Sequence, residues 1–358
     1  MIFPQFLALD IGAFNTKIIQ VAPMGSKMNI KAYTMVPTPP NVIEDGKLSN
    51  IDVLAQSINL ALQEKKIKEK NVVFTISGTS IITREVVLPK AGSKELKSII
   101  EMESAQYFPV NIDSYVLDYK ILEEIKIDKG AQYRILLVAV PVAIIEGYME
   151  LASLCGLNIF SIDFVGNSIV KFVTAEMKEV GKKDKEILDK TVAILDMGYK
   201  TTTVSIISKG SFQFNRILFY GSQDFTNMIA NNLGLTFEEA EKLKINKAAI
   251  ISSDDEPDSQ EAAVISESIR ATLLTFIDDV SRFFDFYNSR STGNHIDQIY
   301  LMGGGCQVQG LESYLQFAFN TPVERIPEFK TTHYSKKMED FKHSQIYFAN
   351  CLGAVLTK

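Results

Sequence analysis

The residues best suited to chemistry form two short turns that occur far apart in the chain. Near the N-terminus, Asp10 closes an apolar run and Gly12 follows two positions later. At mid-chain, Asp196 and Gly198 repeat this spacing after a second apolar run. Apolar residues resume directly after each turn, which predicts a β-hairpin in both places. One such hairpin in each half predicts a duplicated domain whose two turns face a shared cleft.

Both turns suit a phosphate group that is bound together with a cation. Glycine has no Cβ, so Gly12 permits a positive φ and lets a ligand approach the backbone amides. Free N–H groups in such a turn form a site for an anion. A carboxylate repels phosphate, so we expect Asp10 and Asp196 to hold Mg²⁺ through water. A single Asp-x-Gly turn is more often only a turn, and it is the repeat that favours a phosphate site.

A triple glycine and a charged pair extend this candidate site. Gly303-Gly304-Gly305 directly follows an apolar run, and bare backbone there lets a flat ligand lie against the chain. A flexible turn between a strand and a helix explains the glycines equally well. Glu241 and Lys244 lie one helical turn apart, after a capping sequence that begins at Thr236. This pair is either an exposed ion pair or part of the same site.

The elements that must position these residues alternate between strands and helices. Short apolar runs predict strands, and apolar residues at helical spacing predict amphipathic helices. Ser93 can cap a helix that Pro109 ends, and Pro141 suits the start of another helix. The sequence predicts strands over 72–76, 81–88, 115–123, 133–140 and 299–302, and helices over 51–65, 93–108, 141–156, 163–178, 265–287, 309–319 and 346–356.

This order of elements predicts an α/β protein in three parts. Residues 1–85 and 161–185 are expected to form a first lobe. Residues 86–160, with one helix and a few strands, are expected to form a subdomain inserted into that lobe. Residues 186–358 are expected to form the second lobe, with its own smaller part at about 226–298.

Composition indicates an ordinary globular protein. Its 358 residues, 22% charged and 46% hydrophobic, suffice for two lobes with separate cores. A net charge of −6 without a basic block argues against nucleic-acid binding, and the cysteines and histidines lack metal-ligand spacing. The most apolar run, residues 135–145, is too short to cross a bilayer. The N-terminus lacks the basic region of a signal peptide, so we expect a cytoplasmic protein without direct membrane insertion.

In their order along the chain, these motifs resemble the phosphate-1, phosphate-2 and adenosine motifs of the actin-like ATPase superfamily. The resemblance implies two ribonuclease-H-like domains that flank a cleft for ATP and Mg²⁺. The helix-first subdomain inserted after Ser77-Gly78-Thr79 is similar to that of the FtsA cell-division proteins and of the PilM family of type IV pilus assembly. Residues 234–244 and 323–327, and a missing amphipathic tail, look more like the PilM family.

The resemblance implies a role for each motif. Asp10 and Asp196 would hold Mg²⁺ through water, the two hairpins would bind the phosphates, and the charged pair and the triple glycine would contact the ribose and the base. The implied nucleotide-binding residues are Gly12, Ala13, Phe14, Asn15, Thr16, Lys17, Gly198, Tyr199, Lys200, Thr201, Thr202, Glu241, Lys244, Gly303, Gly304 and Gly305.

One position departs from the hydrolytic members of the superfamily. These carry a Glu or Gln in the first inter-domain helix, where it orients the attacking water. Here the corresponding stretch runs from Asp163 to Asn167 and contains neither, so no catalytic residue can be assigned. Phosphoryl transfer depends on placing that water, and the loss therefore predicts slow or absent hydrolysis.

The resemblance also implies a partner, the cytoplasmic N-terminal segment of the inner-membrane pilus protein PilN. This contact would hold the protein at the periphery of the inner membrane. An extended peptide needs a groove with an apolar floor and free backbone groups at its edge. The expected groove residues, on the strand at 81–88 and the helix after it, are Val86, Leu88, Leu96, Ile100, Tyr107 and Phe108. Packing within the subdomain is the alternative explanation for each of them.

Other functions within the superfamily stay open at this point. The chain is alternatively an active ATPase, an FtsA-like protein that self-associates into filaments, or a sugar-kinase-like enzyme. Contacts with other pilus assembly ATPases are a further option. A sugar kinase usually has a clear catalytic Asp and a polar substrate pocket, and the sequence reveals no such set of residues.

Overall fold

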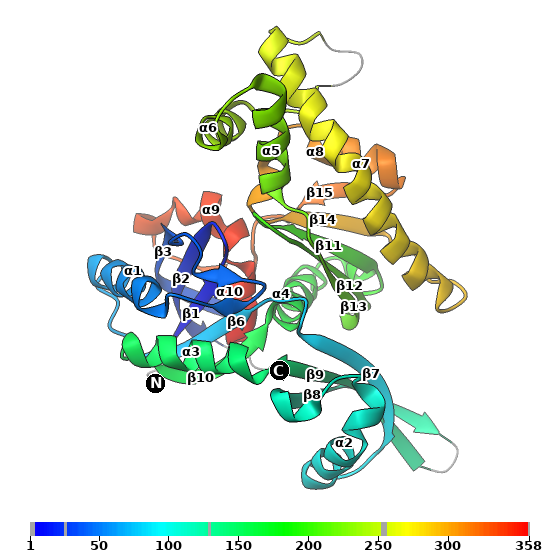
Figure 1. Ribbon diagram of the computed structural model, residues 1–358. Coiled ribbons are helices and arrows are strands. Elements are labelled where there is room, and N and C mark those ends of the chain that lie inside the picture. Colours follow the sequence, from blue (N-terminus) through cyan, green and yellow to red (C-terminus); the bar gives the residue numbers. More distant parts are fainter. Residues whose placement is uncertain (1–3, 25–26, 128–129, 252–255, 357–358) are drawn as a thin grey trace.

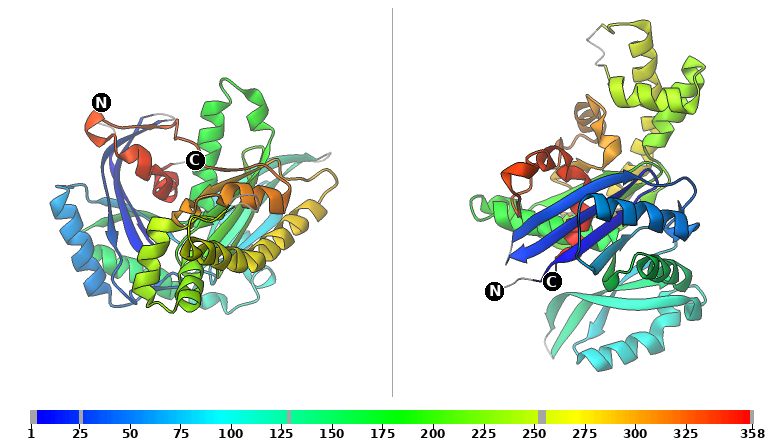
Figure 2. Two further views of the ribbon diagram at one scale, coloured as in Figure 1. Left: turned by 90° about the horizontal axis from the view of Figure 1, so that it is seen from above. Right: turned by 90° about the vertical axis from the view of Figure 1, so that its left-hand side faces the viewer.

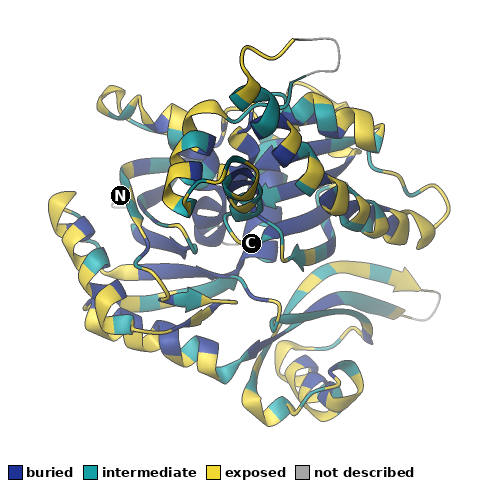
Figure 3. Ribbon diagram, turned by 45° about the horizontal axis from the view of Figure 1, so that its top comes forward, coloured by how far each residue is buried: buried dark blue, intermediate teal, exposed yellow. Residues whose placement is uncertain are grey.

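The computed structural model describes residues 4–24, 27–127, 130–251 and 256–356, and it has two lobes with a smaller subdomain below them (Figure 1). Residues 1–3 of the N-terminal stretch considered above lie outside this part. The strands of both lobes and the helices between them are largely buried, whereas the outer helices carry exposed residues (Figure 3). The protein is therefore of the α/β class, with one layered core in each lobe.

The first lobe is built on a six-stranded sheet in the order β10-β6-β1-β2-β3-β16. Every residue of β1 (Phe6–Ile11) is buried, because the sheet is covered on both faces. β1 pairs antiparallel with β2 (Asn15–Met24), which forms the first predicted hairpin. The other strands of this sheet are β3 (Lys27–Pro37), β6 (Asn71–Ile76), β10 (Asn158–Phe164) and β16 (Thr332–His333).

Helices cover both faces of this first sheet. On the outer side, α1 (Ile51–Glu64) packs on α3 (Val142–Leu154), next to the short hairpin of β4 (Ile43–Glu44) and β5 (Lys47–Leu48). On the side that faces the second lobe lie α4 (Val165–Val180) and α10 (Ala349–Val355) (Figure 1). These two helices approach closely, since a Cβ on Gly353 would lie 1.9 Å from the carbonyl oxygen of Ser168. Only glycine fits at this crossing.

The second lobe repeats the hairpin in a five-stranded sheet of order β13-β12-β11-β14-β15. β11 (Thr191–Met197) pairs antiparallel with β12 (Thr202–Ser208), and parallel with β14 (Gln298–Met302). Helices α5, α6 and the start of α7 project from the top of the molecule (Figure 2). The remaining elements of this lobe are β13 (Ser211–Leu218), β15 (Val323–Arg325), α5 (Ser222–Leu233), α6 (Phe237–Lys247), α7 (Gln260–Ser289) and α8 (Leu311–Phe319).

The C-terminal segment returns to the first lobe. β16 pairs in parallel with β3, and α10 packs against α4, β1, β2 and β6. The short helix α9 (Phe341–Ser344) lies between them, and its Phe341 packs edge-on against Tyr33 of β3 at 4.9 Å between ring centroids. The sequence analysis assigned residues 186–358 to the second lobe, and we propose instead that the segment from β16 to α10 is part of the first.

The inserted subdomain has a hydrophobic core of its own. Its sheet has the order β7-β9-β8 and is covered by α2 (Ser93–Tyr107), as the helix-first pattern predicted. The strands are β7 (Ile82–Pro89), β8 (Tyr115–Ile127) and β9 (Gly130–Pro141). Since α3 and β10 belong to the first lobe, we propose that the subdomain spans about 82–141 rather than 86–160.

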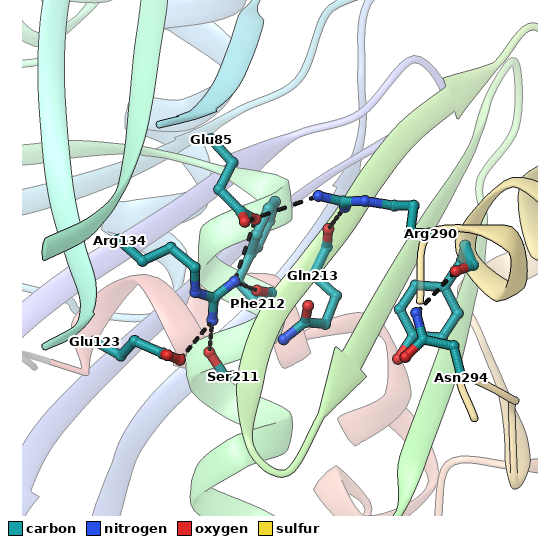
Figure 4. Close-up of polar contacts among 9 residues, drawn as sticks. Glu85, Glu123, Arg134, Ser211, Phe212, Gln213, Arg290 and Asn294 are labelled. Atoms are coloured by element: carbon teal, nitrogen blue, oxygen red, sulfur yellow. Dashed lines mark hydrogen bonds and ion pairs between the residues drawn. The ribbon is translucent and has the colours of Figure 1, made fainter. Parts of the chain in front are cut away.

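A polar junction joins this subdomain to the second lobe (Figure 4). Arg134 of β9 forms ion pairs with Glu85 of β7 at 3.2 Å and with Glu123 of β8 at 3.1 Å. Its guanidinium also donates to the hydroxyl of Ser211 on β13 at 2.8 Å. Arg290, at the end of α7, lies 3.8 Å from Glu85. The junction therefore crosses from β7 and β9 to the edge strand of the second sheet.

Several elements escaped the sequence analysis, among them β10 and α5. The stretch 163–178 was predicted as helix throughout, but its first residues end the strand β10, which pairs in parallel with β6. β10 is a short strand at the edge of the sheet, and its apolar residues alternate with polar ones. In the sequence, this pattern could not be separated from that of the helix that follows it. Helix α5 was also missed, although its apolar residues Phe225, Ile229 and Leu233 lie at helical spacing.

Candidate nucleotide site

The two hairpins have matching turns. In the first, the amide of Gly12 donates to the carbonyl of Asn15 at 3.1 Å, and in the second the amide of Gly198 donates to that of Thr201 at 2.9 Å. The expectation of a positive φ at Gly12 is wrong, because this glycine is not in the left-handed region. A Cβ there would instead lie 3.0 Å from the backbone carbonyl oxygen of Asn15, and 2.9 Å from the Nζ of Lys17. Glycine is thus needed for space rather than for backbone conformation.

The tips of both hairpins present backbone N–H groups to a ligand. In the part of the chain that the structure describes, no protein group accepts a hydrogen bond from the amides of Ala13 and Phe14. The same holds for Tyr199, Lys200 and Thr201 in the second hairpin. All five residues line one cavity. Unpaired amides that converge on one space form an anion site.

This cavity of about 700 Å³ lies between the two lobes. It brings together residues from all the motifs that the sequence analysis singled out. Two of the implied residues are not among those that line it, because Thr16 bonds to the hydroxyl of Thr38 at 2.8 Å and Thr202 donates to the carbonyl of Tyr220 at 2.8 Å. The implied residues that line the cavity are Asp10, Gly12, Ala13, Phe14, Asn15, Lys17, Asp196, Gly198, Tyr199, Lys200, Thr201, Glu241, Lys244, Gly303, Gly304 and Gly305.

Lys17 holds a positive charge between the two carboxylates. Its Nζ lies 3.1 Å from Oδ2 of Asp10, directly across the hairpin. Burial opposes the charge of Lys17, but the nearby carboxylates of Asp10 and Asp196 outweigh this effect and raise its pKa. Burial raises the pKa of the Asp196 carboxyl. The hydrogen bond that its Oδ2 accepts from Asn350 at 2.8 Å acts in the opposite direction but is the smaller effect. The floor of the cavity is therefore a desolvated network of charges.

These carboxylates fit a water-mediated Mg²⁺ ion. Asp10 and Asp196 each use Oδ2 within the protein, and their Oδ1 atoms accept no hydrogen bond from a described residue. The described residues contain no cluster of three or more His, Cys, Asp or Glu side chains that could hold a metal by itself. Mg²⁺ commonly binds in this way, through one or two carboxylates, several waters and the phosphates of a substrate.

Glu241 and Lys244 are buried in a polar cluster on α6 instead of forming an exposed pair. The Nζ of Lys244 donates to Glu241 at 2.8 Å, and to the carbonyl of Ser222 and the hydroxyl of Thr226 on α5 at 2.9 Å each. Burial lowers the pKa of Lys244, although Glu241 acts in the opposite direction. The predicted capping box of Thr236 and Glu239 starts this helix. The pair thus joins α5 to α6 and also lines the cavity.

The triple glycine approaches the second hairpin closely. Gly303 has φ +84°, and a Cβ there would lie 2.4 Å from the carbonyl oxygen of Met197. Gly305 is packed against Met197 in a similar way. Gly304 differs, because the only atom near its Cβ position is a ring carbon of Tyr347 at 3.7 Å. Gly304 therefore faces open space in the cavity, where a side chain would meet a ligand rather than the protein.

Several residues that line the cavity escaped the sequence analysis. Asn350 reaches Asp196 from α10, far along the chain, and its buried Oδ1 has no hydrogen-bond partner among the described residues. Phe219 and Ile245 line the cavity although 73% and 65% of their surfaces are exposed. Such exposed apolar walls suit a flat organic ring. No motif marks these positions in the sequence, since each comes from a different element.

Asp163 and Asn167, the polar residues in the stretch where hydrolytic members of the superfamily position the water, bond to other residues of the protein. Oδ1 of Asp163 accepts from Asn167 at 2.8 Å, and its Oδ2 accepts from Ser168 at 2.9 Å and pairs with Lys171 at 2.8 Å. Asn167 in turn accepts from Lys120 of the inserted subdomain at 2.8 Å. Neither lines the cavity, and the residue that does so at the start of α4 is Val165. An apolar side chain cannot orient a water molecule.

The expected peptide groove is closed in this structure. Leu88, Leu96, Ile100 and Phe108 are at most 4% exposed and form the core of the inserted subdomain. Val86 and Tyr107 pack against that core. The alternative explanation, packing within the subdomain, thus accounts for all six residues.

Fold and cavity together define a class of protein. Two duplicated lobes with paired Asp-x-Gly hairpins across a cleft are the architecture of the actin-like ATPase fold. MreB5 of Spiroplasma citri bound to ADP has this fold, with a TM-score of 0.51 at 12% identity over 90% of this chain and 92% of MreB5. The cell division protein FtsA of Bacillus subtilis (strain 168) is 23% identical over 262 residues, which cover 67% of this chain and 57% of FtsA. This chain thus spans little more than half the length of that relative.

The chain belongs to the PilM family of type IV pilus assembly proteins, because residues 8–356 match the family described as "Type IV pilus assembly protein PilM". The solved PilM-PilN type IV pilus biogenesis complex contains a similar chain, with a TM-score of 0.82 at 24% identity over 97% of this chain and 96% of that one. No helix in the described residues is long and apolar enough to cross a membrane.

Proposed function

We propose that this chain is a nucleotide-binding scaffold of type IV pilus assembly, which binds ATP and Mg²⁺ between its lobes and hydrolyses ATP slowly or not at all. One observation carries the proposal, namely that the unpaired amides of two matching hairpins line a single cavity. Lys17 and the five free amides compensate the charge of the phosphates. Mg²⁺ would supply the positive charge that allows Asp10 and Asp196 to lie near them.

The remaining walls suit the rest of the nucleotide. Gly304 offers bare backbone, and the exposed apolar side chains of Phe219 and Ile245 offer a surface for the base. The proposal of weak hydrolysis is supported by the start of α4, where Val165 lines the cavity while Asp163 and Asn167 bond to other residues.

The nucleotide proposal is tested with a glycine variant. Gly304→Val fills the open space of the cavity without meeting the protein backbone, so we expect ATP binding to weaken at least about tenfold, or ~1.4 kcal/mol. Binding of Mg-ATP is measured by isothermal titration calorimetry, and the fold of each variant is checked by circular dichroism. Gly92→Val is the matched control. Gly92 lies in the inserted subdomain, and a Cβ on it would meet nothing within 4 Å.

Equal ATP affinity of the parent and a folded Gly304→Val variant would show that the base does not lie against this loop. Absence of ATP binding by the parent protein would overturn the proposal as a whole.

We further propose that the inserted subdomain docks the cytoplasmic N-terminal segment of a PilN-like membrane protein. Since the core of the subdomain is closed, the exposed edge of β7 replaces the groove as the proposed surface. Among the described residues, β7 pairs only with β9 and lies at the edge of its sheet, so its other side offers backbone groups for strand addition. Similarity to the PilM-PilN complex supports a partner of this kind. Through this partner the chain would lie at the cytoplasmic side of the inner membrane.

The docking proposal is tested at both edges of the same sheet. Val87 on β7 is 49% exposed and Val116 on β8 is 44% exposed. A lysine at an edge disfavours the addition of a strand. We expect Val87→Lys to weaken binding of a synthetic PilN N-terminal peptide at least about tenfold, and Val116→Lys to leave it unchanged. Equal loss in both variants, or no binding by the parent, contradicts docking at β7.

A further inference from the structure

A second cavity lies where the inserted subdomain leaves the first lobe. It has a volume of about 290 Å³ and is bordered by the start of β7, the start of α4 and the end of β13. Two of the residues that line it are arginines, Arg84 and Arg216, and none of them is an Asp or Glu. The cavity therefore contains positive charge without a carboxylate in its wall.

The two arginines are not neutralised within the described part of the chain. Arg84 donates to the carbonyl of Thr83 at 3.0 Å and Arg216 to that of Asn215 at 2.8 Å, and neither forms an ion pair there. Arg216 is exposed to solvent, and its guanidinium lies over the ring of Phe214, 5.1 Å from the centroid. The protein around the guanidinium lowers the pKa of Arg216 by desolvation, and the positive charge of Arg84 lowers it further. Two guanidinium groups that repel each other in one cavity favour an anion between them.

The neighbouring carboxylate is held elsewhere. Side chains alternate along a strand, so Glu85 lies on the opposite face of β7 from Arg84. Glu85 pairs there with Arg134 at 3.2 Å and with Arg290 at 3.8 Å (Figure 4). Glu85, the acidic residue nearest to Arg84 in sequence, is thus paired at the junction and does not neutralise Arg84.

The start of α4 contributes to the same cavity. Its first residues, Val165 and Gly166, line the wall, and no side chain caps this end of the 16-residue helix. The positive end of the helix dipole adds to the charge of the two arginines. The side chain of Asn215, which bonds to Ser205 at 2.9 Å, packs against Gly166, where a Cβ would lie 2.6 Å from it.

This cavity adjoins the nucleotide cleft. Five residues line both spaces, and one of them, Thr203, lies on the second strand of the second hairpin: Ser77, Gly78, Val165, Thr203 and Ile217. An anion in the smaller cavity would thus be adjacent to the hairpins that are proposed to hold the phosphates.

We propose that Arg84 and Arg216 form a second phosphate site behind the cleft, which takes either free inorganic phosphate or the terminal phosphate of the nucleotide. Guanidinium groups bind phosphate through paired hydrogen bonds, and the absence of a carboxylate in the wall removes a competing partner. The site itself stands on the geometry of this cavity, and only the nucleotide as a source of phosphate rests on the proposed function.

The test titrates inorganic phosphate into the nucleotide-free protein and follows binding by calorimetry. We expect saturable binding, and at least about tenfold weaker binding in the double variant Arg84→Gln, Arg216→Gln. The hairpins are unchanged in this variant, so phosphate bound by them alone would not be affected. Arg282→Gln is the matched control, because Arg282 is 75% exposed on α7 and far from the cavity in sequence. The single variant Arg216→Gln serves if the double variant fails to fold.

A second arm titrates ATP and ADP into the same variants. Selective loss of ATP affinity identifies the terminal phosphate of the nucleotide as the ligand, and loss of phosphate binding alone identifies free phosphate. The proposal is overturned if the folded variants bind phosphate and both nucleotides as the parent does, or if the parent binds no phosphate at millimolar concentration and the variants keep full ATP affinity. If the parent does not bind ATP, the proposed function is contradicted, but the titration with inorganic phosphate still tests the site at Arg84 and Arg216.

Discussion

At the scale of single residues, the cavity floor shows how one lysine allows two carboxylates to be buried together. Lys17 pairs with Asp10, and its charge also acts on Asp196. Asp196 has no ion pair of its own among the described residues and relies on the amide of Asn350. A carboxyl with a raised pKa in this position destabilises the protein when it ionises, and a bound cation would relieve that effect.

We therefore expect Asp196→Asn to stabilise the nucleotide-free protein. Because the pKa of Asp196 is raised in the folded state above its ordinary value of 3.8, its ionised form is disfavoured there as the pH rises. Below that value the carboxyl is protonated in both states and the substitution changes little. The gain in melting temperature should thus grow from acidic pH towards neutrality, while Mg-ATP binding is lost.

Thermal unfolding followed by circular dichroism between acidic and neutral pH measures this difference. Asp278→Asn, which removes an exposed carboxyl on α7, is the control for the change in net charge. A gain that is the same at all pH values, or largest in acid, would contradict a raised pKa at Asp196.

At the scale of elements, the contact between α5 and α6 decides whether Glu241 and Lys244 act on structure or on ligand. Both side chains are largely buried, at 13% and 8% exposure. Lys244 donates to Glu241, Thr226 and Ser222, and Glu241 accepts from Lys244 and Thr226 through Oε2. Sequence spacing alone predicted that Glu241 and Lys244, one helical turn apart, form an ion pair. The packing of α5 on α6 makes it a buried pair whose members line the cleft.

Lys244→Met should destabilise the protein by about 3–5 kcal/mol, because it leaves the carboxylate of Glu241 buried without its partner. In the double variant Glu241→Leu, Lys244→Met both charges are absent, and most of this stability should return. If the pair also contacts the ribose, ATP affinity stays low in the double variant. Urea unfolding and ATP titration of the same samples separate the two effects, and full recovery of ATP binding would assign the pair a structural role only.

At the scale of the whole molecule, the two lobes are joined by a helix from the middle of the chain, α4, and by one near its C-terminus, α10. α4 follows the first sheet and contacts β12 and β13 of the second, while α10 returns from the C-terminus to pack on α4. The inserted subdomain reaches the second lobe through Arg134 and Arg290 (Figure 4). The proposed nucleotide and the proposed partner would therefore act on parts of the molecule that are in direct contact.

Slow turnover is the prediction that belongs to this scale, because it depends on how the lobes face each other. With Val165 at the cleft, we expect steady-state phosphate release well below the ~1 per second at the low end of ordinary enzymes. Val165→Gln would place an amide where a water could be oriented and should raise the rate. Release is measured with a phosphate-binding reporter under saturating Mg-ATP. Turnover by the parent at ordinary enzyme rates would contradict the scaffold proposal.

The sequence by itself determined what depends on neighbouring residues. The two hairpins, the capping box at Thr236 and the long helix through Phe276 follow from local spacing, since hydrogen bonds within a turn or a helix connect residues a few positions apart. The order of the two hairpins and the triple glycine indicated the actin-like superfamily. Local stretches such as 234–244 and 323–327 indicated the PilM family, which the family match confirms.

The tertiary structure decided what depends on residues that are far apart in the chain. It buried Ile100 and Phe108 in a separate core, brought Asn350 to Asp196, and placed Arg84 and Arg216 in the lining of one cavity. A buried apolar face and an apolar groove have the same periodicity, so the sequence could not distinguish them. Contacts across more than a hundred residues leave no local pattern, because only the packing of one lobe on the other creates them.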